Sequence, residues 1–160
     1  MDLSKSTKEL IREIERIWVA EVIKKIKEKI EEEDLIFSGG LLSSIKSEYD
    51  DQSVDGDFKF GMADWGKFQD LGVNPLGAKL YQTDFQFKGN VAGTAFALEE
   101  WASQKRLNNW AVASKLQFTK GIRPKNFFNS TIEALYPKLG ERIVQLQIDK
   151  LKFDIEKRNK

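Results

Sequence analysis

Apolar residues near the start of the chain recur every three or four positions, the spacing of one face of an α-helix. Lysine and glutamate fill the other face. Ser6-Thr7-Lys8-Glu9 precedes the stripe and fits a capping box, in which a hydroxyl and a carboxylate satisfy backbone donors. We predict a helix over residues 6–33, either a core helix or one that partly overhangs the core and packs on another subunit. The stripe consists of Ile11, Ile14, Trp18, Val22, Ile26 and Ile30, widened by Leu10 and Ile17.

After residue 45 the period changes to alternation, which is typical of strands. Asp55-Gly56 divides two alternating runs and favours a tight hairpin turn. The sequence therefore predicts a β-hairpin over residues 45–62 with an acidic tip. The alternating residues are Ile45, Ser47 and Tyr49 before the turn and Phe58 and Phe60 after it.

Two less regular segments follow the hairpin. Trp65 to Gly72 is too irregular for a clean strand, and we predict a strand end or a short helical turn closed by the glycine. Residues 74–94 contain several glycines and a proline around a stretch of β character, so we predict an extended loop or arm, or a second hairpin. Its aromatic residues either contact a partner or pack on the sheet.

Helical spacing returns over residues 97–120, where we predict a central helical region with faces that can be buried. The residues that recur mostly at steps of three and four are Trp101, Trp110, Ala113, Leu116 and Phe118. Gly121 can adopt a positive φ that ends a helix, and Pro124 has no N–H to continue one. The next two residues of interest, Phe127 and Phe128, are expected to form an apolar plug between two helices.

A second long helical pattern covers residues 129–157, and Pro137 inside it predicts a kink or a break. The first apolar stripe is Ile132, Leu135, Leu139, Ile143 and Leu146, and the second is Val144, Ile148, Leu151 and Ile155. The expected fold class is therefore α+β, with a long N-terminal helix, a small antiparallel sheet with hairpins, a central helix and a long C-terminal helix packed on it.

Composition favours one folded domain over residues 1–160, because 41% of the residues are hydrophobic and include 11 Phe and 4 Trp. The net charge of +1 conceals two biased segments. Residues 48–70 hold seven acids and two bases, whereas residues 103–125 hold six bases and no acid. These segments are either solvated faces of one fold or complementary surfaces of neighbouring copies.

Histidine and cysteine are both absent, which excludes disulfides, thiol nucleophiles, zinc sites built on these residues and histidine-based catalysis. We predict no catalytic residue, no cofactor, no bound metal and no enzymatic activity. No apolar run approaches the ~20 residues of a membrane span. We expect a protein that is made in a cytoplasm, stays soluble and has no membrane partner.

One enzymatic alternative remains open at this stage. Asp50, Asp51, Asp55 and Asp57 supply the residue type that a metal-dependent phosphodiesterase needs. A hairpin, however, places alternate side chains on opposite faces, so these carboxylates are poorly arranged to converge on two magnesium ions.

Three motifs in order resemble those of the tail-completion and neck proteins of tailed bacteriophages, which join the DNA-filled head to the tail. Gly39 to Ile45, reading GGLLSSI, is similar to the Gly-x-Leu-x-x-Ser-Ile segment of that family. Trp65 to Gly72 resembles its aromatic segment ending in an acid, an apolar residue and glycine. Trp101 opens a helix that, like the family's, contains alanines at 111 and 113 and closes in Gly-x-x-Pro-x-x-Phe, here residues 121–127.

The resemblance implies a structural protein of the virion at the head–tail junction. Such proteins form closed rings, here expected to hold six or twelve copies, and contact a portal or adaptor ring and tail proteins. Double-stranded DNA would pass through the lumen without sequence readout. The alternative is a tail-tube terminator or another tail component, which would have the same kind of contacts but a different position in the virion. Our candidate partner contacts are Tyr81, Phe85, Phe87, Asp55, Asp57, Lys105, Arg106, Arg123, Phe127 and Phe128.

Overall fold

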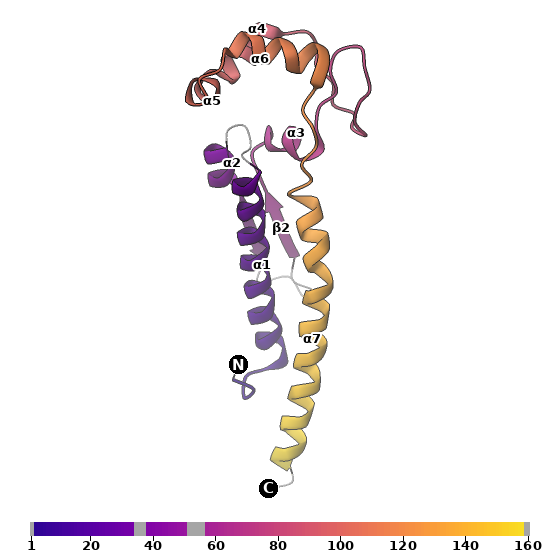
Figure 1. Ribbon diagram of the computed structural model, residues 1–160. Coiled ribbons are helices and arrows are strands. Elements are labelled where there is room, and N and C mark those ends of the chain that lie inside the picture. The colour runs from indigo at the N-terminus through magenta and orange to yellow at the C-terminus, as the bar shows by residue number, and fades with distance from the viewer. Residues whose placement is uncertain (1, 34–37, 51–56, 159–160) are drawn as a thin grey trace.

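The computed structural model describes residues 2–33, 38–50 and 57–158 and has an elongated shape (Figure 1). Two long helices and a β-hairpin form a stalk. A smaller unit, which we call the crown and which comprises residues 73–122, sits on one end of the stalk. Both described chain ends lie at the other end of the stalk. The fold is mainly helical with one small antiparallel sheet, so it is α+β only in the broad sense.

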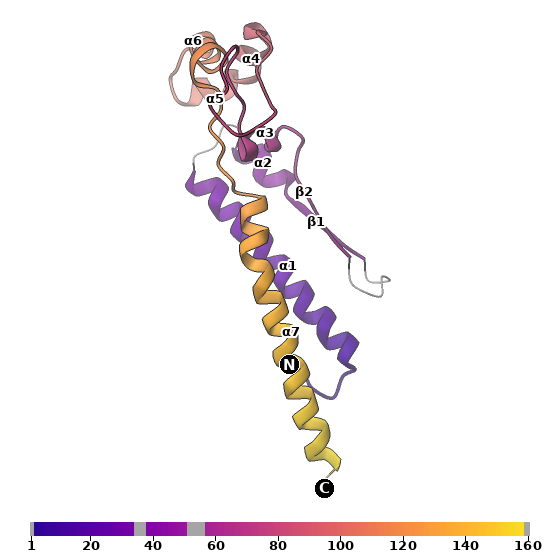
Figure 2. The same ribbon diagram turned by 90° about the vertical axis from the view of Figure 1, so that its right-hand side faces the viewer.

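The stalk is built on helices α1 (Thr7–Glu32) and α7 (Asn129–Arg158), which run antiparallel and side by side (Figures 1 and 2). The predicted capping box is confirmed. Ser6 Oγ accepts a hydrogen bond from the Glu9 N–H, and the Ser6 N–H donates to Glu9 Oε2 at 2.9 Å. Glu33 follows as the C-cap. The predicted bounds of the first helix therefore agree with the structure.

The sheet consists of β1 (Lys46–Asp50) and β2 (Asp57–Gly61), paired antiparallel as the alternation predicts. Phe60 pairs with Ser47 and Phe58 with Tyr49 in the register. The acidic tip, including the Asp55-Gly56 turn, lies outside the described residues. Figure 2 shows the two strands on one side of the helix pair, inclined to α7.

Trp18 on α1 joins all parts of the stalk. Its indole packs edge-to-face against Phe58 at 5.5 Å and Phe60 at 5.8 Å, measured between ring centroids. Its Nε1–H donates to the Leu135 carbonyl of α7 at 2.8 Å. The residue is 1% exposed. Because its indole N–H has an acceptor, burying the ring leaves no hydrogen-bond donor of this side chain unsatisfied.

Two short helices close the stalk beneath the crown, α2 (Ser38–Ser44) and α3 (Gly66–Leu71). They pack tightly, because a Cβ on Gly66 would lie 2.6 Å from Leu41 Cδ1. For the segment from Trp65 to Gly72, the short helical turn is therefore the correct alternative.

The chain crosses between stalk and crown twice, and the two crossings are bonded to each other. The Val73 N–H donates to the Ile122 carbonyl at 2.8 Å, and the Ile122 N–H donates to the Val73 carbonyl at 2.7 Å. Gly72 and Gly121 flank this bridge with φ values of 80° and 64°. The positive φ predicted for Gly121 is confirmed, and this glycine ends the helical part of the crown.

The crown contains α4 (Val91–Ala97), α5 (Glu99–Gln104), α6 (Asn109–Lys115) and a π-helical turn, η1 (Leu116–Lys120). The prediction of one central helical region is thus too coarse. Arg106 adopts a φ of 55° between α5 and α6, and the Asn108 side chain caps the new helix by accepting from the Ala111 N–H. A left-handed residue followed by an N-cap divides the helix.

Residues 74–90 form a loop without a regular helix or strand, so the second hairpin is the wrong alternative for this segment. The segment folds back on Asn74, whose Oδ1 accepts from the Leu80 and Tyr81 N–H groups at 2.7 Å each. Its Nδ2 donates to the carbonyls of Tyr81 and Thr83. The β character of residues 80–87 yields one isolated bridge, Asn74 to Gln86, because the buried asparagine satisfies the backbone groups that a strand would have paired. Helix α4 already begins at Val91.

The break that is one of the two alternatives predicted at Pro137 does not occur, because α7 continues through this residue to Arg158. Leu135 and Leu139 on either side are buried against the stalk core, so tertiary packing outweighs the lost backbone hydrogen bond. Ile17 differs from its predicted burial, since it is 54% exposed. Within the described residues, none of the helices is both long and apolar enough to span a membrane.

Candidate assembly surfaces

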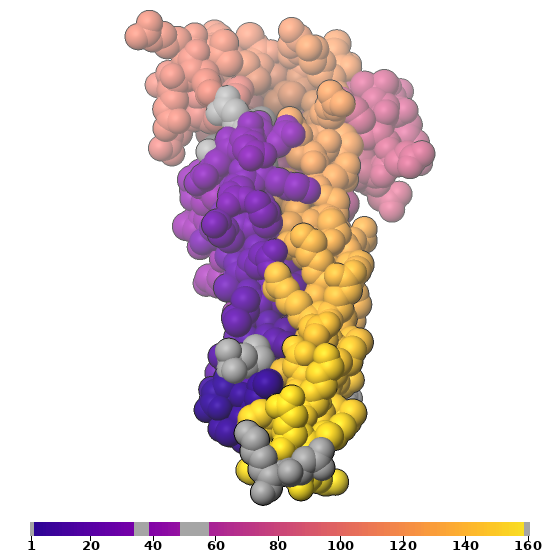
Figure 3. Space-filling view, turned by 60° about the horizontal axis from the view of Figure 1, so that its bottom comes forward, coloured from indigo at the N-terminus to yellow at the C-terminus, as the bar shows by residue number. Residues whose placement is uncertain are grey.

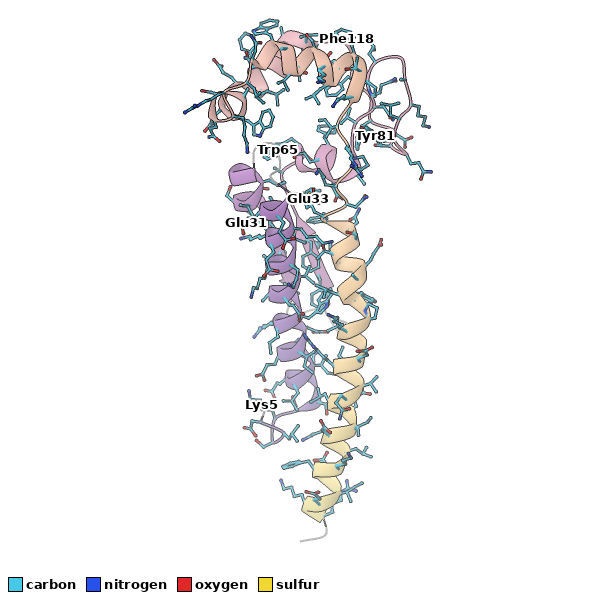
Figure 4. The ribbon with its side chains drawn as sticks, viewed as in Figure 1. Lys5, Glu31, Glu33, Trp65, Tyr81 and Phe118 are labelled. Atoms are coloured by element: carbon cyan, nitrogen blue, oxygen red, sulfur yellow. The ribbon has the colours of Figure 1, made fainter. Side chains whose placement is uncertain are left out.

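A groove of about 990 Å³ separates the crown from the top of the stalk. Trp65 and Phe68 line it from the stalk side, and Leu98, Trp101 and Leu116 line it from the crown. Figure 4 shows Trp65 at this position, below the arch of the crown. A groove of this size and mostly apolar lining is the kind of surface that receives a ligand or a segment of another protein.

Two polar atoms of the groove lining have unmet hydrogen-bonding capacity. Gln117 Nε2 donates to the Asn90 carbonyl and to Thr94 Oγ1 at 2.6 Å each. Among the described residues, however, Gln117 Oε1 and Trp101 Nε1 are buried without a partner. Each such group costs about 1–3 kcal/mol. Buried polar atoms on the crown side of the groove therefore have fewer of their hydrogen bonds formed than those of the stalk core.

The crown exposes aromatic side chains on its outer surface. Phe96 is 67% exposed and packs edge-to-face against Trp110 at 6.2 Å between ring centroids. Leu107 and Phe118 are also exposed, and Figure 4 places Phe118 on the side of the crown that faces away from the stalk. The buried hydrophobic cluster of the crown is small by comparison, since it is centred on Ala95, Leu98 and Ala113. Large aromatic side chains of the crown are thus exposed, while its core is built on small residues. Sequence periodicity missed this arrangement, because it predicted Trp110 and Phe118 to lie on faces that can be buried.

A second exposed apolar surface lies on the C-terminal half of α7. Val144, Ile148, Leu151 and Ile155 are between 45% and 65% exposed. The first apolar stripe of α7 packs into the stalk core as predicted. The two apolar surfaces of the molecule thus lie at opposite ends of its long axis (Figures 1 and 3).

Phe127 and Phe128 are not available to a partner, so these two candidates are wrong as contact residues. They are 0% and 8% exposed and belong to the stalk core. Asp70, itself 1% exposed, holds the segment in place by accepting from the Phe128 N–H at 2.8 Å. The plug that the sequence predicts does form, but it fills this chain's own core.

The aromatic candidates of the folded-back segment are half-buried and have contacts within the chain. Phe85 packs against Phe68 at 4.9 Å between ring centroids, and Phe87 lines the groove. Tyr81 donates its hydroxyl proton to the Lys120 carbonyl at 2.8 Å and lies beside the crown in Figure 4. Their remaining exposed area leaves a partner contact as a hypothesis.

The basic candidates are exposed. Lys105 and Arg106 lie in the turn between α5 and α6, and Arg123 lies in the connection back to the stalk. Asp55 lies outside the described residues, and Asp57 is the first residue of β2, next to them. The acidic and basic segments therefore occupy different parts of the molecule, the hairpin and the crown with its connection.

The titratable groups with clear perturbations belong to helix ends and surface ion pairs. Hydrogen bonds from the Ser6 side chain and backbone lower the pKa of Glu9 below its ordinary value. The Lys125 ammonium lowers the pKa of Glu33 through a hydrogen bond and its charge, and this pair ties the end of α1 to the segment before α7. In the part of the chain that is described, no three acidic side chains gather where they could hold a metal ion. Of the four acids of the alternative enzymatic hypothesis, Asp50 ends β1 and Asp57 begins β2, whereas Asp51 and Asp55 lie outside the described residues.

We compared the chain with known protein families, with curated proteins and with solved structures, and none of them matches it significantly.

Proposed function

We propose that the protein is a structural subunit of a tailed-bacteriophage virion, which assembles with its own copies into a ring at the head–tail junction. The observation that carries this proposal is that apolar side chains are exposed at both ends of an elongated molecule. Phe96 and Trp110 mark one end and the outer face of α7 the other. Exposed apolar patches at these positions are typical of protein–protein contacts.

The three motifs that resemble the neck proteins also meet in space, which supports the proposal. Gly66 of the second motif packs against Leu41 of the first. The backbone at Gly72 approaches Ile122 of the third, where an added Cβ would lie 2.7 Å from the carbonyl oxygen. Segments far apart in the sequence therefore form one junction between stalk and crown, as expected for motifs that share a structural role.

A closed ring requires unlike faces of neighbouring copies to meet. Basic residues of the crown and of its connection to the stalk, such as Arg106 and Arg123, form one suitable face, and the acidic hairpin forms the unlike face. Buried aromatic residues would contribute most of the affinity, while charges would set the register. In this arrangement DNA passes through the lumen without being read, and the portal or adaptor ring and the tail are the neighbours above and below.

Mass photometry of the purified chain, alone and with portal or tail partners, tests the proposal. We expect closed assemblies of six or twelve copies. Reversing Arg106 and Arg123 to glutamate should reduce ring formation, whereas reversing Lys138 on the exposed side of α7 is the matched control and should not. A strict monomer under all these conditions would contradict the proposal.

Microscopy of particles that lack the protein tests its position in the virion. Loss of a neck subunit should leave DNA-filled heads beside complete free tails. Altered tails on otherwise normal particles would instead favour the alternative, a tail-tube terminator.

A further inference from the structure

The C-terminal half of α7 carries a second apolar face that no described part of the chain covers. Its four members, Val144, Ile148, Leu151 and Ile155, are spaced by four, three and four residues. Each is between 45% and 65% exposed. This spacing is the 3.5-residue repeat of a coiled-coil seam, which differs from scattered exposed apolar residues.

This face points away from the stalk core. At ~100° per residue, its centre lies roughly 140° around the helix from the face formed by Leu139, Ile143 and Leu146. Those three residues pack into the stalk core. Lys150 Nζ reaches the Leu3 carbonyl at 2.7 Å, and beyond this point α7 extends past the start of α1 (Figure 1). Figure 3 shows α1 against one side of α7, while the yellow C-terminal end forms the outer surface of the stalk.

We propose that this face binds the same face of a second copy of the chain, in a parallel two-stranded coiled coil. Isoleucine occupies the two a positions, 148 and 155, and valine and leucine occupy the two d positions, 144 and 151. In a parallel coiled coil, β-branched residues at a with leucine at d favour two strands over three or four. Both a positions and the d position at Leu151 follow this rule, so the residue types favour a pair of helices.

The residues that flank the seam permit this pairing. In a parallel pair, Gln147 at a g position faces Lys152 of the second copy at an e position, so no like charges meet. The seam also ends where the sequence would oppose it. Glu141 occupies the preceding a position, where two carboxylates would face each other, and Pro137 occupies the preceding d position. The contact is thus limited to residues 144–155, or ~17 Å of helix.

A seam of this length is short, so we expect association that depends on concentration. A parallel pair keeps both crowns at the same end. The pairing uses the outer face of α7, which is also one of the two exposed surfaces behind the ring proposed above, so the experiments below are chosen to separate the two.

Cysteine trapping tests the pairing directly, because the chain contains no cysteine. Ile148→Cys places a single thiol at an a position, where the two copies of a parallel pair bring their Cα atoms within disulfide range. Mild oxidation should convert most of this variant into a covalent dimer. Glu156→Cys, exposed on the same helix at a b position outside the seam, is the matched control and should stay mostly monomeric.

Two results would overturn the inference. One is equal cross-linking of Ile148→Cys and Glu156→Cys. The other is failure of Ile148→Cys to link to itself while a mixture with Leu151→Cys links efficiently, because this pattern indicates antiparallel helices. Light scattering of Ile148→Lys, which keeps the inner face of α7 intact, should show the loss of concentration-dependent dimers, and unchanged dimerisation would also contradict the pairing.

The outcome can be separated from that of the ring proposal. Rings that form normally in Ile148→Lys, with no cross-link at position 148, would refute the seam alone. Cross-linked pairs that never assemble into rings would support the seam and refute the ring.

Discussion

The backbone bridge between stalk and crown depends on Gly121, and replacing this residue with alanine tests the junction. Gly121 has a φ of 64° and a ψ of −166°, a region that is essentially restricted to glycine. An added Cβ would lie 2.2 Å from the Val73 carbonyl oxygen. That oxygen also accepts the Ile122 N–H, so it cannot move away without weakening the bridge.

The cost of Gly121→Ala has two parts. Holding an alanine in this backbone conformation costs about 1–3 kcal/mol. Forcing the Cβ into an occupied space costs about 1–3 kcal/mol more, because Pro75 crowds the same side and the nearest atom belongs to the backbone. The expected loss of unfolding free energy is therefore about 2–6 kcal/mol, a large share of the total of a typical domain.

Alanine substitutions at two other glycines separate the two contributions to this loss of unfolding free energy. Chemical denaturation monitored by tryptophan fluorescence measures all three variants. Gly77 has a φ of 77° but open space around its Cβ, so Gly77→Ala should show the backbone cost alone, about 1–2 kcal/mol. Gly140 lies in α7 with open space, and Gly140→Ala should stabilise the chain by up to about 1 kcal/mol. If Gly121→Ala and Gly77→Ala agree within about 0.5 kcal/mol, the close approach at the bridge does not exist as described.

Three further substitutions test the helix ends. Asp70→Ala should lower the unfolding free energy by about 1–3 kcal/mol, because it leaves the buried Phe128 N–H without its acceptor. Denaturant unfolding would measure this loss, and an unchanged midpoint would refute the contact. Ser6→Ala should cost about 0.5–2 kcal/mol in the same assay through loss of the N-cap of α1, whereas Ser4→Ala, just outside the helix, should have little effect. Glu9→Gln should reduce stability only where Glu9 is charged: the folded-state pKa is lowered, so the stabilisation is present above the ordinary glutamate pKa and is lost as pH falls through the lowered value. Melting curves of Glu9→Gln and wild type should therefore converge on acidification, and a constant difference would contradict the linkage.

The long elements could be predicted because several local signals agree at each of them. Around α1, the capping box and the apolar stripe from Ile14 to Ile30 both indicate the same helix, and the stripe is what the stalk buries. The hairpin was predictable for a similar reason, since the alternation of Phe58 and Phe60 determines which side chains reach Trp18. Where local preferences agree in this way, they already determine the secondary structure, and tertiary packing does not change it.

The crown could not be predicted in the same way, because its structure depends on single residues. Arg106 takes a left-handed conformation without being glycine, and Asn108 begins a helix inside what reads as a continuous helical pattern. The side chain of Asn74 organises the chain as far as Thr83, although Asn74-Pro75 does signal a turn. Periodicity also does not distinguish a face that is buried from one that is exposed. Trp110 is exposed although its spacing predicts a face that can be buried, and Phe127 is buried although it is a candidate for a partner contact.

The junction determines how the two candidate surfaces can act together. The crown has a small core of its own, and its connection to the stalk includes the Val73–Ile122 bridge, close backbone packing at Gly72 and the contact of Phe85 with Phe68 of α3. Backbone contacts of this kind fix the orientation of the crown without relying on a large buried area. The exposed aromatic residues of the crown are thereby held at a set distance from the outer face of α7. Substitutions at the junction should consequently impair assembly even though they touch neither surface, whereas substitutions on one surface should leave the fold of the stalk intact.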